Sequence, residues 1–177
     1  MTESILIAIV LAVIGILVYV GKKPDDFQIQ RSITINATAE KIFPMINDLR
    51  ISQTWSAWEK VDPGMQRRFD GPASGIGAKY AWSGNREIGQ GEMEIALSSP
   101  NTKVRYHMHF IRPFEGRSDI DFDLSENGGQ TRVTQTMRGK SAGILPKLMC
   151  ALFFDQDKMI GGKFEQGLAA LKTLMEA

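Results

Sequence analysis

The side chains best suited to chemistry in this sequence are two histidines and the carboxylates near them. His107 and His109 are two residues apart in an alternating segment, so both point to one face of a strand, as metal ligands would. Asp121 or Asp123 on another segment could complete such a site. However, Arg105 shares that face, and no third strong ligand is fixed by spacing. We therefore expect cross-strand charge pairs here and no metal site.

Sequence motifs for covalent or cofactor chemistry are weak. No Ser-His-Asp order, carboxylate dyad or metal motif falls on the apolar strand faces. Residues 71–77 are glycine-rich like a phosphate-binding loop, but no Gly-Lys-Ser/Thr sequence follows them. The single cysteine, Cys150, excludes an internal disulfide, and its apolar neighbours favour a buried side chain. We predict no catalytic residue, no metal and no cofactor, although Tyr80 or Tyr106 could polarise a carbonyl group.

The charge balance excludes one class of partner. The 177 residues include 21 Lys and Arg and 20 Asp and Glu, a formal net charge of +1. A nucleic-acid-binding protein normally carries a basic excess or a basic stripe, and neither is present. We therefore expect no nucleic-acid partner.

The N-terminal segment is the strongest single signal in the sequence. Residues Ile5 to Val20 carry no charge and include 12 Ile, Leu or Val residues, which favours a membrane-spanning helix. The alternative, a cleaved secretory signal, needs a basic start and a small-residue cleavage site, and the sequence has neither. We expect an uncleaved transmembrane helix over residues 1–21, with Lys22 and Lys23 reaching the headgroups.

The same region predicts where the rest of the chain lies. The lysines near the span follow it, so the positive-inside rule places the C-terminal domain in the cytoplasm of a single-pass protein, in a bacterial inner membrane. A linker over residues 22–26 reaches less than about 20 Å, so the domain over residues 27–177 must lie close to the bilayer.

Hydrophobic periodicity predicts the elements that position the side chains. Phe27–Ile35 alternates as a strand, Thr38 is placed as the N-cap of a helix, and from Pro146 to the C-terminus the pattern is helical. The first helix carries Ile42, Phe43, Ile46 and Leu49, and the last carries Leu148, Leu152, Phe164, Leu168, Leu171 and Met175. Five more strands are predicted at 76–82, 92–97, 103–111, 118–124 and 131–137. This order predicts an α+β fold with helices on one face of an antiparallel sheet.

The predicted strands separate into a polar and an apolar face. The polar face alternates acidic and basic strands, which favours charge pairs in solvent. It carries Glu92, Glu94, Arg105, His107, His109, Asp119, Asp121, Asp123, Arg132 and Thr134. The apolar face carries Ile76, Ala78, Tyr80, Trp82, Met93, Ile95, Leu97, Val104, Tyr106, Met108, Phe110, Ile120, Phe122, Leu124, Val133 and Met137.

The apolar face has two interpretations. It is either a core filled by the C-terminal helix, or the wall of a ligand cavity, because it is rich in aromatic and methionine side chains with a few polar atoms. Gln135 lies between Val133 and Met137, and Arg31 lies between Ile29 and Ile33, where it could extend out at the sheet edge.

Seven segments between about Phe27 and the C-terminus together carry a resemblance to a known superfamily. They are 32–37, 46–49, 55–60, 71–77, 82–85, 89–93 and 164–168. With them the chain resembles the SRPBCC superfamily of helix-grip proteins, which includes START-like domains, in its bacterial polyketide cyclase/dehydrase-like branch.

The resemblance implies a curved antiparallel sheet around a long C-terminal helix, with a deep hydrophobic cavity between them. Gly161, Gly162 and Gly167 would permit close packing of helix and sheet, or a bend, and the Trp55–Trp58 loop would lie near the cavity mouth. The expected cavity residues are Trp55, Trp58, Tyr80, Trp82, Met93, Ile95, Tyr106, Met108, Phe110, Phe122 and Gln135.

Three functions follow from these features. The preferred one is a membrane-anchored binding protein for a hydrophobic or lipid-like small molecule. The alternatives are a polyketide cyclase/dehydratase-like enzyme and a membrane-tethered protein-interaction module. For the last, residues 143–154 would expose an apolar side to the membrane or to a protein partner.

Overall fold

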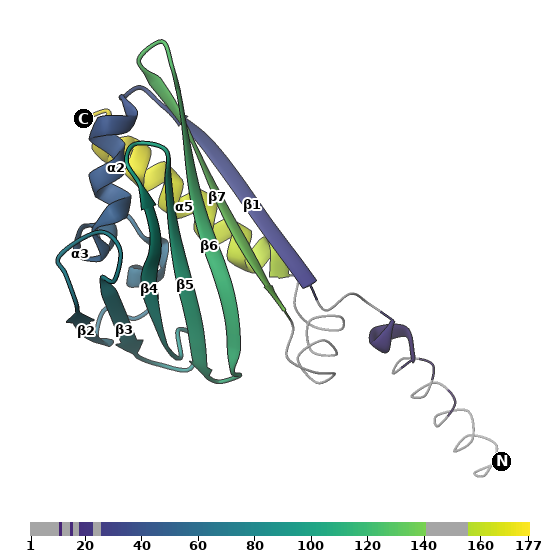
Figure 1. Ribbon diagram of the computed structural model, residues 1–177. Helices are drawn as coiled ribbons and strands as arrows, with labels where there is room; N and C mark the ends of the chain where they lie inside the picture. The colour runs from purple at the N-terminus through teal and green to yellow at the C-terminus, as the bar shows by residue number, and fades with distance from the viewer. Residues whose placement is uncertain (1–10, 12–14, 16–17, 23–25, 141–155) are drawn as a thin grey trace.

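A computed structural model describes residues 11, 15, 18–22, 26–140 and 156–177. Its elements follow the order strand, helices, strands, helix (Figure 1). They are β1 Asp26–Ile35, α2 Ala39–Asn47, α3 Leu49–Ser52, the 3-10 helix η1 Ala57–Lys60, β2 Gln66–Asp70, β3 Lys79–Ser83, β4 Gln90–Ser99, β5 Lys103–Arg112, β6 Gly116–Asn127, β7 Gln130–Lys140 and α5 Gln156–Met175.

All seven strands form one antiparallel sheet in the order β1-β7-β6-β5-β4-β3-β2. Strands β2 to β7 are neighbours in sequence order. Strand β1 pairs along its whole length with β7, so β1 forms one edge of the sheet and β2 the other. Figure 1 shows α5 behind the sheet, lying across β1 and β7. The predicted α+β class with an antiparallel sheet and a C-terminal helix is confirmed.

Three details of the strand prediction are wrong. Strand β2 was not predicted, because its sequence Gln66-Arg-Arg-Phe-Asp70 has one apolar residue and forms an edge. Ile76 precedes β3 and is 63% exposed, so it is not part of the core. A β-bulge between Ile95 and Leu97 shifts the register, and Leu97 pairs with Arg105 instead of continuing the apolar row.

The predicted first helix is two helices. Thr38 holds the N-cap position of α2, as expected, but its side chain forms no capping hydrogen bond. Asp48 ends α2 in extended geometry, and its carboxylate accepts hydrogen bonds from the backbone N–H groups of Arg50 and Ile51 to start α3.

Helix α5 packs on the sheet through the predicted stripe and through a polar contact. Phe164, Leu168 and Leu171 are buried in the main hydrophobic cluster, which spans both α5 and the inner face of the sheet. Arg31 does not simply extend to solvent: its guanidinium forms ion pairs with Asp157 at 2.8 Å and with Glu165 at 2.5 Å on α5.

Gly161 makes this contact possible. A Cβ atom at this position would lie 2.2 Å from a guanidinium nitrogen of Arg31, so the close approach expected of this glycine occurs here. At Gly162, in contrast, a Cβ atom would meet nothing within 4 Å.

Part of the sequence prediction lies outside the described residues. Most of the predicted span Ile5–Val20 is not described, and among the described residues no helix is long and apolar enough to cross a membrane. The beginning of the predicted last helix, Cys150 and the segment 143–154 also lie outside them. The division into residues 1–21, 22–26 and 27–177 stays a prediction.

Candidate functional site

An aromatic row crosses the inner face of the sheet, the face toward α5. Phe69 of β2 stacks on Tyr80 of β3 with ring centroids 5.0 Å apart, and Tyr80 stacks on Trp82 at 5.8 Å. Phe110 of β5 meets the Trp82 ring edge-on at 5.6 Å. These four side chains, which we call the aromatic row, form one continuous apolar surface from the sheet edge to its centre.

A glycine in β4 lets the aromatic row stay continuous. Gly91 lies between Trp82 and Phe110 in the strand register. A Cβ atom at Gly91 would lie 2.4 Å from the Trp82 ring, so the indole covers the bare backbone of β4. The indole Nε1 donates a hydrogen bond to the carbonyl oxygen of Ile88 at 3.2 Å, which fixes the ring in place.

A second aromatic group lies deeper, under the helices. Phe122 of β6 contacts Trp55 edge-on at 5.9 Å between centroids and Tyr106 at 5.3 Å. The Trp55 indole donates to the carbonyl of Met45, and the Tyr106 hydroxyl donates to the carbonyl of Ile46, both in α2. Helix α2 is thereby held over the inner face by side-chain hydrogen bonds.

The structure brings the sequence-predicted cavity residues together on this inner face. Eight of them are buried: Trp55, Tyr80, Trp82, Ile95, Tyr106, Met108, Phe122 and Gln135. Three are half-buried and pack against the same cluster: Trp58, Met93 and Phe110. Trp58 sits at the α5 side, where Lys163 lies over its ring at 5.9 Å from the centroid. The location of a bound ligand among them stays a prediction.

Both inner-face tyrosines are held protonated by their surroundings. Burial and the hydrogen bond that its hydroxyl donates to Glu59 at 2.8 Å raise the pKa of Tyr80 above its ordinary value. Burial likewise raises the pKa of Tyr106. Each hydroxyl already donates its proton to a protein acceptor, so both are better suited to line a wall than to transfer protons.

Glu59 is a site residue that the sequence reasoning missed. Its carboxylate, which is 13% exposed, accepts from Tyr80 and from Arg67 Nε at 2.8 Å. It joins η1 to β2 and β3 at the edge of the aromatic row. Its place directly after Trp58, in a segment already identified by resemblance, was the one available signal.

One buried polar atom on the inner face has no partner. Gln135 of β7 is 7% exposed, and its Oε1 is the buried side-chain oxygen or nitrogen without a hydrogen bond in the described part of the chain. In the register it lies between Arg31 of β1 and Phe122 of β6. An unpaired buried acceptor costs about 1–3 kcal/mol, so a donor brought by a ligand would be stabilised there.

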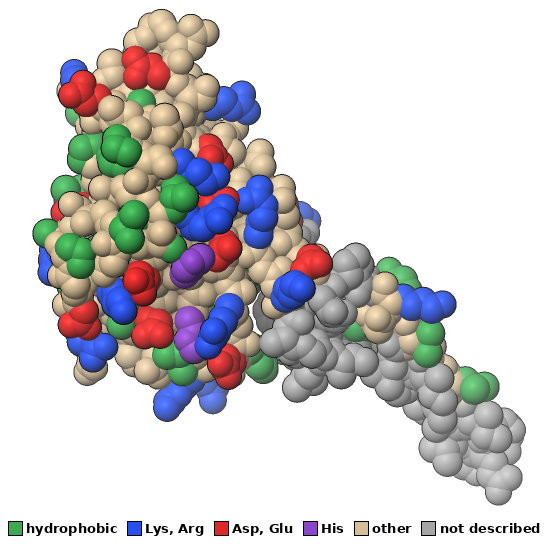
Figure 2. All heavy atoms as spheres, in the orientation of Figure 1, with side chains coloured by type: hydrophobic (Ala, Val, Ile, Leu, Met, Phe, Trp, Pro, Cys, Tyr) green, Lys and Arg blue, Asp and Glu red, His purple; other side chains and the backbone are tan. Residues whose placement is uncertain are grey.

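The opposite face of the sheet carries the charge pairs that the sequence predicts (Figure 2). Cross-strand pairs include Lys79 with Glu94 at 3.4 Å and Lys103 with Asp123 at 2.8 Å. His107 lies 2.7 Å from Asp119, and His109 contacts Glu92 and Glu115 at 3.5 and 3.1 Å. In the described residues no three His, Cys, Asp or Glu side chains gather as a metal site.

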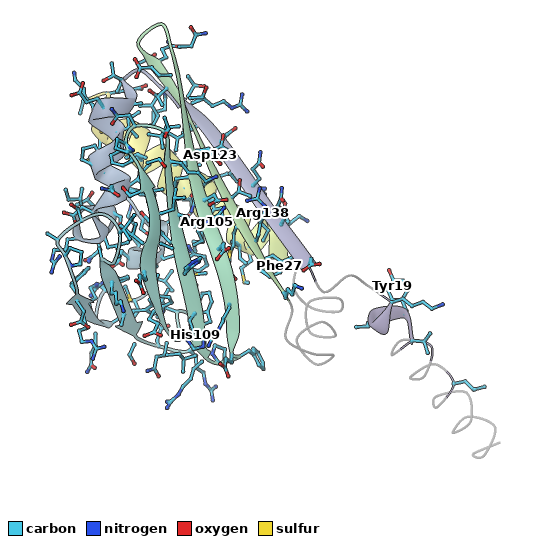
Figure 3. All side chains as sticks on the ribbon, viewed as in Figure 1. Tyr19, Phe27, Arg105, His109, Asp123 and Arg138 are labelled. Atoms are coloured by element: carbon cyan, nitrogen blue, oxygen red, sulfur yellow. The ribbon has the colours of Figure 1, made fainter. Side chains whose placement is uncertain are left out.

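Asp121 is the exception on this face, because it is buried. Its side chain is 2% exposed and receives two hydrogen bonds from Arg105, at 2.6 and 2.9 Å, and one from Arg138 at 2.8 Å. Lys103 lies at 3.5 Å. Arg105 and Arg138 come from β5 and β7 on either side of it (Figure 3). Burial acts to raise its pKa, but the hydrogen bonds from Arg105 and the three positive charges outweigh it, so the pKa is lowered.

A shallow groove of about 880 Å³ runs across all seven strands. Two rows of mostly charged side chains on the polar face form its sides. Its floor is the backbone of the residues between these rows, whose own side chains point to the inner face. The first row is Gln28, Arg138, Asp119, His107, Glu94, Lys79 and Asp70, and the second is Asp26, Lys140, Arg117, His109, Glu92, Ala81 and Arg68. Both rows mix positive and negative side chains, so the groove favours neither an anionic nor a cationic ligand.

With this geometry established, comparison with known proteins identifies the family. Residues 26–176 match the model of the family described as polyketide cyclase / dehydrase and lipid transport. The chain belongs to this family. The match covers every strand and helix described after residue 25, which agrees with the SRPBCC helix-grip resemblance. The family description implies binding of hydrophobic small molecules.

Solved structures share the fold at low sequence identity. Protein CV1439 from Chromobacterium violaceum superposes with a TM-score of 0.60 at 13% identity, covering 88% of this chain and 99% of its own. The Aha1 dimer from Colwellia psychrerythraea gives 0.58 at 20% identity, covering 85% and 96%. Protein MLL2253 from Mesorhizobium loti gives 0.58 at 18% identity, covering 85% and 100%. No curated protein matches significantly.

Proposed function

We propose that this protein is a membrane-anchored binding protein for a hydrophobic or lipid-like small molecule, held on the inner face of the sheet beside α5. The observation that carries the proposal is the aromatic row from Phe69 to Phe110, which provides a continuous apolar surface. The family description, which names lipid transport, supports the same class of ligand.

The polar atoms of the inner face support binding over catalysis. Tyr80 and Tyr106 donate their hydroxyl protons to protein acceptors, and the Trp55 and Trp82 indoles do the same. Among the described residues, Gln135 Oε1 is the buried side-chain atom without a partner, so it can accept a hydrogen bond from a ligand. A mostly apolar ligand with one hydroxyl or amine group would fit this pattern.

The membrane anchor is part of the same proposal. Residues Ile5 to Val20 are apolar enough to span a bilayer, and the linker of residues 22–26 keeps the domain within about 20 Å of it. An anchored binding domain can exchange ligands with the bilayer without carrying them through water. We infer a cytoplasmic orientation from Lys22 and Lys23.

A pair of neighbouring substitutions tests the ligand site. Met93 is half-buried on the inner face, and Glu94, the next residue, has a 45% exposed side chain on the polar face. Met93→Trp adds bulk beside the aromatic row, and Glu94→Trp adds the same bulk on the polar face. Organic extracts of the purified full-length chain are then analysed by mass spectrometry for small molecules per mole of protein.

The two variants are expected to differ. We expect Met93→Trp to reduce the co-purifying molecule severalfold, while Glu94→Trp retains the parent amount. Equal amounts in the parent and both variants would mean that the molecules come from carried-over membrane, and the inner-face proposal would be wrong. Circular dichroism of both variants controls for folding.

A further inference from the structure

The β5–β6 turn carries an exposed apolar and basic surface. Between β5 and β6, Ile111 is 38% exposed and Phe114 is 48% exposed. Arg112 and Arg117 flank them, are exposed, and form no ion pair with another described residue. We call residues 111–117 the hairpin tip. A large aromatic side chain between two unpaired arginines is typical of a surface that contacts lipid headgroups.

The sheet topology places the hairpin tip at the end where the N-terminal linker arrives. Because neighbouring strands are antiparallel, the start of β1, the end of β7, the start of β6 and the end of β5 lie at one end of the sheet (Figure 1). Strands lie about 4.8 Å apart, so the tip is roughly 10–15 Å from the start of β1 across the sheet.

The hairpin tip also projects beyond the end of β7. The last pair between β6 and β7 is Ser118 with Gly139, but the β5–β6 hairpin continues to the pair Phe110 with Gly116 and then turns. At about 3.3 Å per residue, the tip extends on the order of 10 Å past that last pair. The tip therefore extends past β7 at this sheet end, while β4 runs beside it as far as the pair Gln90 with Arg112.

The other end of the sheet lacks this combination of exposed apolar and basic side chains. Its turns at residues 99–103 and 127–130 contain no exposed large hydrophobic side chain, and its turn at residues 71–78 carries the exposed Ile76 but no basic residue. An amphipathic tip at one end alone indicates a surface contact at that end. The linker of residues 22–26 joins β1 at the same end, so the bilayer is the surface that the tip would contact.

We propose that the hairpin tip docks on the bilayer, with Phe114 and Ile111 in the interfacial region and Arg112 and Arg117 on anionic headgroups. This inference rests on the proposed membrane anchor. Docking would fix the orientation of the domain, so that the sheet end with Trp82 and Phe110 faces the lipid. Each arginine near an anionic surface is expected to favour the docked domain about fivefold.

Quenching by brominated lipids tests the docking. The full-length chain is reconstituted into vesicles of phosphatidylcholine and phosphatidylglycerol with brominated acyl chains. Phe114→Trp adds a reporter at the tip, and Thr102→Trp adds one at the opposite sheet end. The emission of the parent, with its native tryptophans, is subtracted from both. Flotation of the vesicles measures whether the chain is anchored.

The expected result is quenching of the added emission in Phe114→Trp but not in Thr102→Trp. Adding Arg112→Gln and Arg117→Gln, or omitting phosphatidylglycerol, is expected to weaken that quenching. If the chain floats with the vesicles but both reporters stay equally unquenched, docking is overturned and the anchor stands. If the chain does not float, the anchor is overturned, and the docking inference with it.

Discussion

At the scale of single residues, burial decides which charges matter to this fold. Asp121 has a 2% exposed side chain and neutralises charge from Arg105, Arg138 and Lys103. The neighbouring carboxylate Asp123 is half-exposed and pairs with Lys103 alone at 2.8 Å. Ion pairs at the surface contribute little to folding stability. Removing one partner of a buried charge network, in contrast, leaves the other charges uncompensated.

Substitution of Asp121 should therefore destabilise the protein. We expect Asp121→Asn to lower the free energy of unfolding by about 2 kcal/mol, because Arg105 and Arg138 lose their charged acceptor. Asp123→Asn should change it by less than about 0.5 kcal/mol. Equilibrium denaturation of both variants measures this, and equal effects would contradict the role given to Asp121.

The same residue predicts a pH dependence. A carboxyl whose pKa is lowered on folding stabilises the fold above its unfolded pKa, about 3.9, and that contribution is lost as pH falls through the lower folded pKa. The parent should lose stability below about pH 4, and Asp121→Asn should lose less over that interval. Acid denaturation curves that run parallel for parent and variant would count against this assignment.

Substitution of Gln135 should affect ligand binding and not stability, unlike substitution of Asp121. Its Oε1 is buried without a partner in the described structure, so Gln135→Met should not reduce the stability of the ligand-free domain by more than about 0.5 kcal/mol. The variant should bind the co-purifying molecule less well, because the acceptor is gone. A large loss of stability without any loss of ligand would instead make Gln135 a structural residue.

At the scale of elements, α5 is held on the sheet by a stripe of apolar side chains and by polar contacts with β1, which come from Arg31 and from the Lys172 hydrogen bond to the Thr34 carbonyl. Arg31 reaches from β1 across Gly161 to Asp157 and Glu165, which lie about two turns apart on the helix. These carboxylates raise the pKa of Arg31 and fix its guanidinium over the bare backbone. The glycine is required by this contact.

Two adjacent glycines give a matched test of this packing. Gly161→Ala places a methyl group 2.2 Å from Arg31, so it should displace the guanidinium and destabilise the protein by about 1–3 kcal/mol. Gly162→Ala meets nothing within 4 Å and should stabilise it by up to about 1 kcal/mol. Thermal unfolding of the two variants measures the difference, and shifts of the same sign would contradict it.

The sequence predicted the elements better than their irregularities. Alternation identified six strands because one face of each is buried, and it grouped Tyr80, Trp82 and Phe110 correctly. Strand β2 was missed because only Phe69 in it is apolar. The bulge that moves Leu97 off the apolar row is a backbone feature that hydropathy does not encode.

The sequence predicted the apolar side chains of the inner face but not the polar contacts around them. Ten of the eleven predicted side chains lie in or against one hydrophobic cluster, and Gln135 is buried on the same face. Periodicity fixes the face for those on strands, and the family resemblance supplied Trp55 and Trp58. Glu59 and the burial of Asp121 were missed because both depend on long side chains from other elements, Arg67 in one case and Arg105 in the other. Sequence spacing gives no account of such contacts.

At the scale of the whole molecule, the anchor, the sheet end and the inner face form one proposal. Residues 22–26 join the proposed span to β1 at the sheet end that carries the hairpin tip. Trp82 and Phe110 of the aromatic row lie near that same end. A ligand that leaves the bilayer there would reach an apolar surface within the length of the linker.

Native mass spectrometry of the full-length chain, released from its own membranes, tests the central claim most directly. We predict one hydrophobic molecule bound per chain, displaced when excess lipid of the same class is added. A chain that is consistently free of bound molecules, and that takes up no added lipid, would contradict a binding function for the inner face.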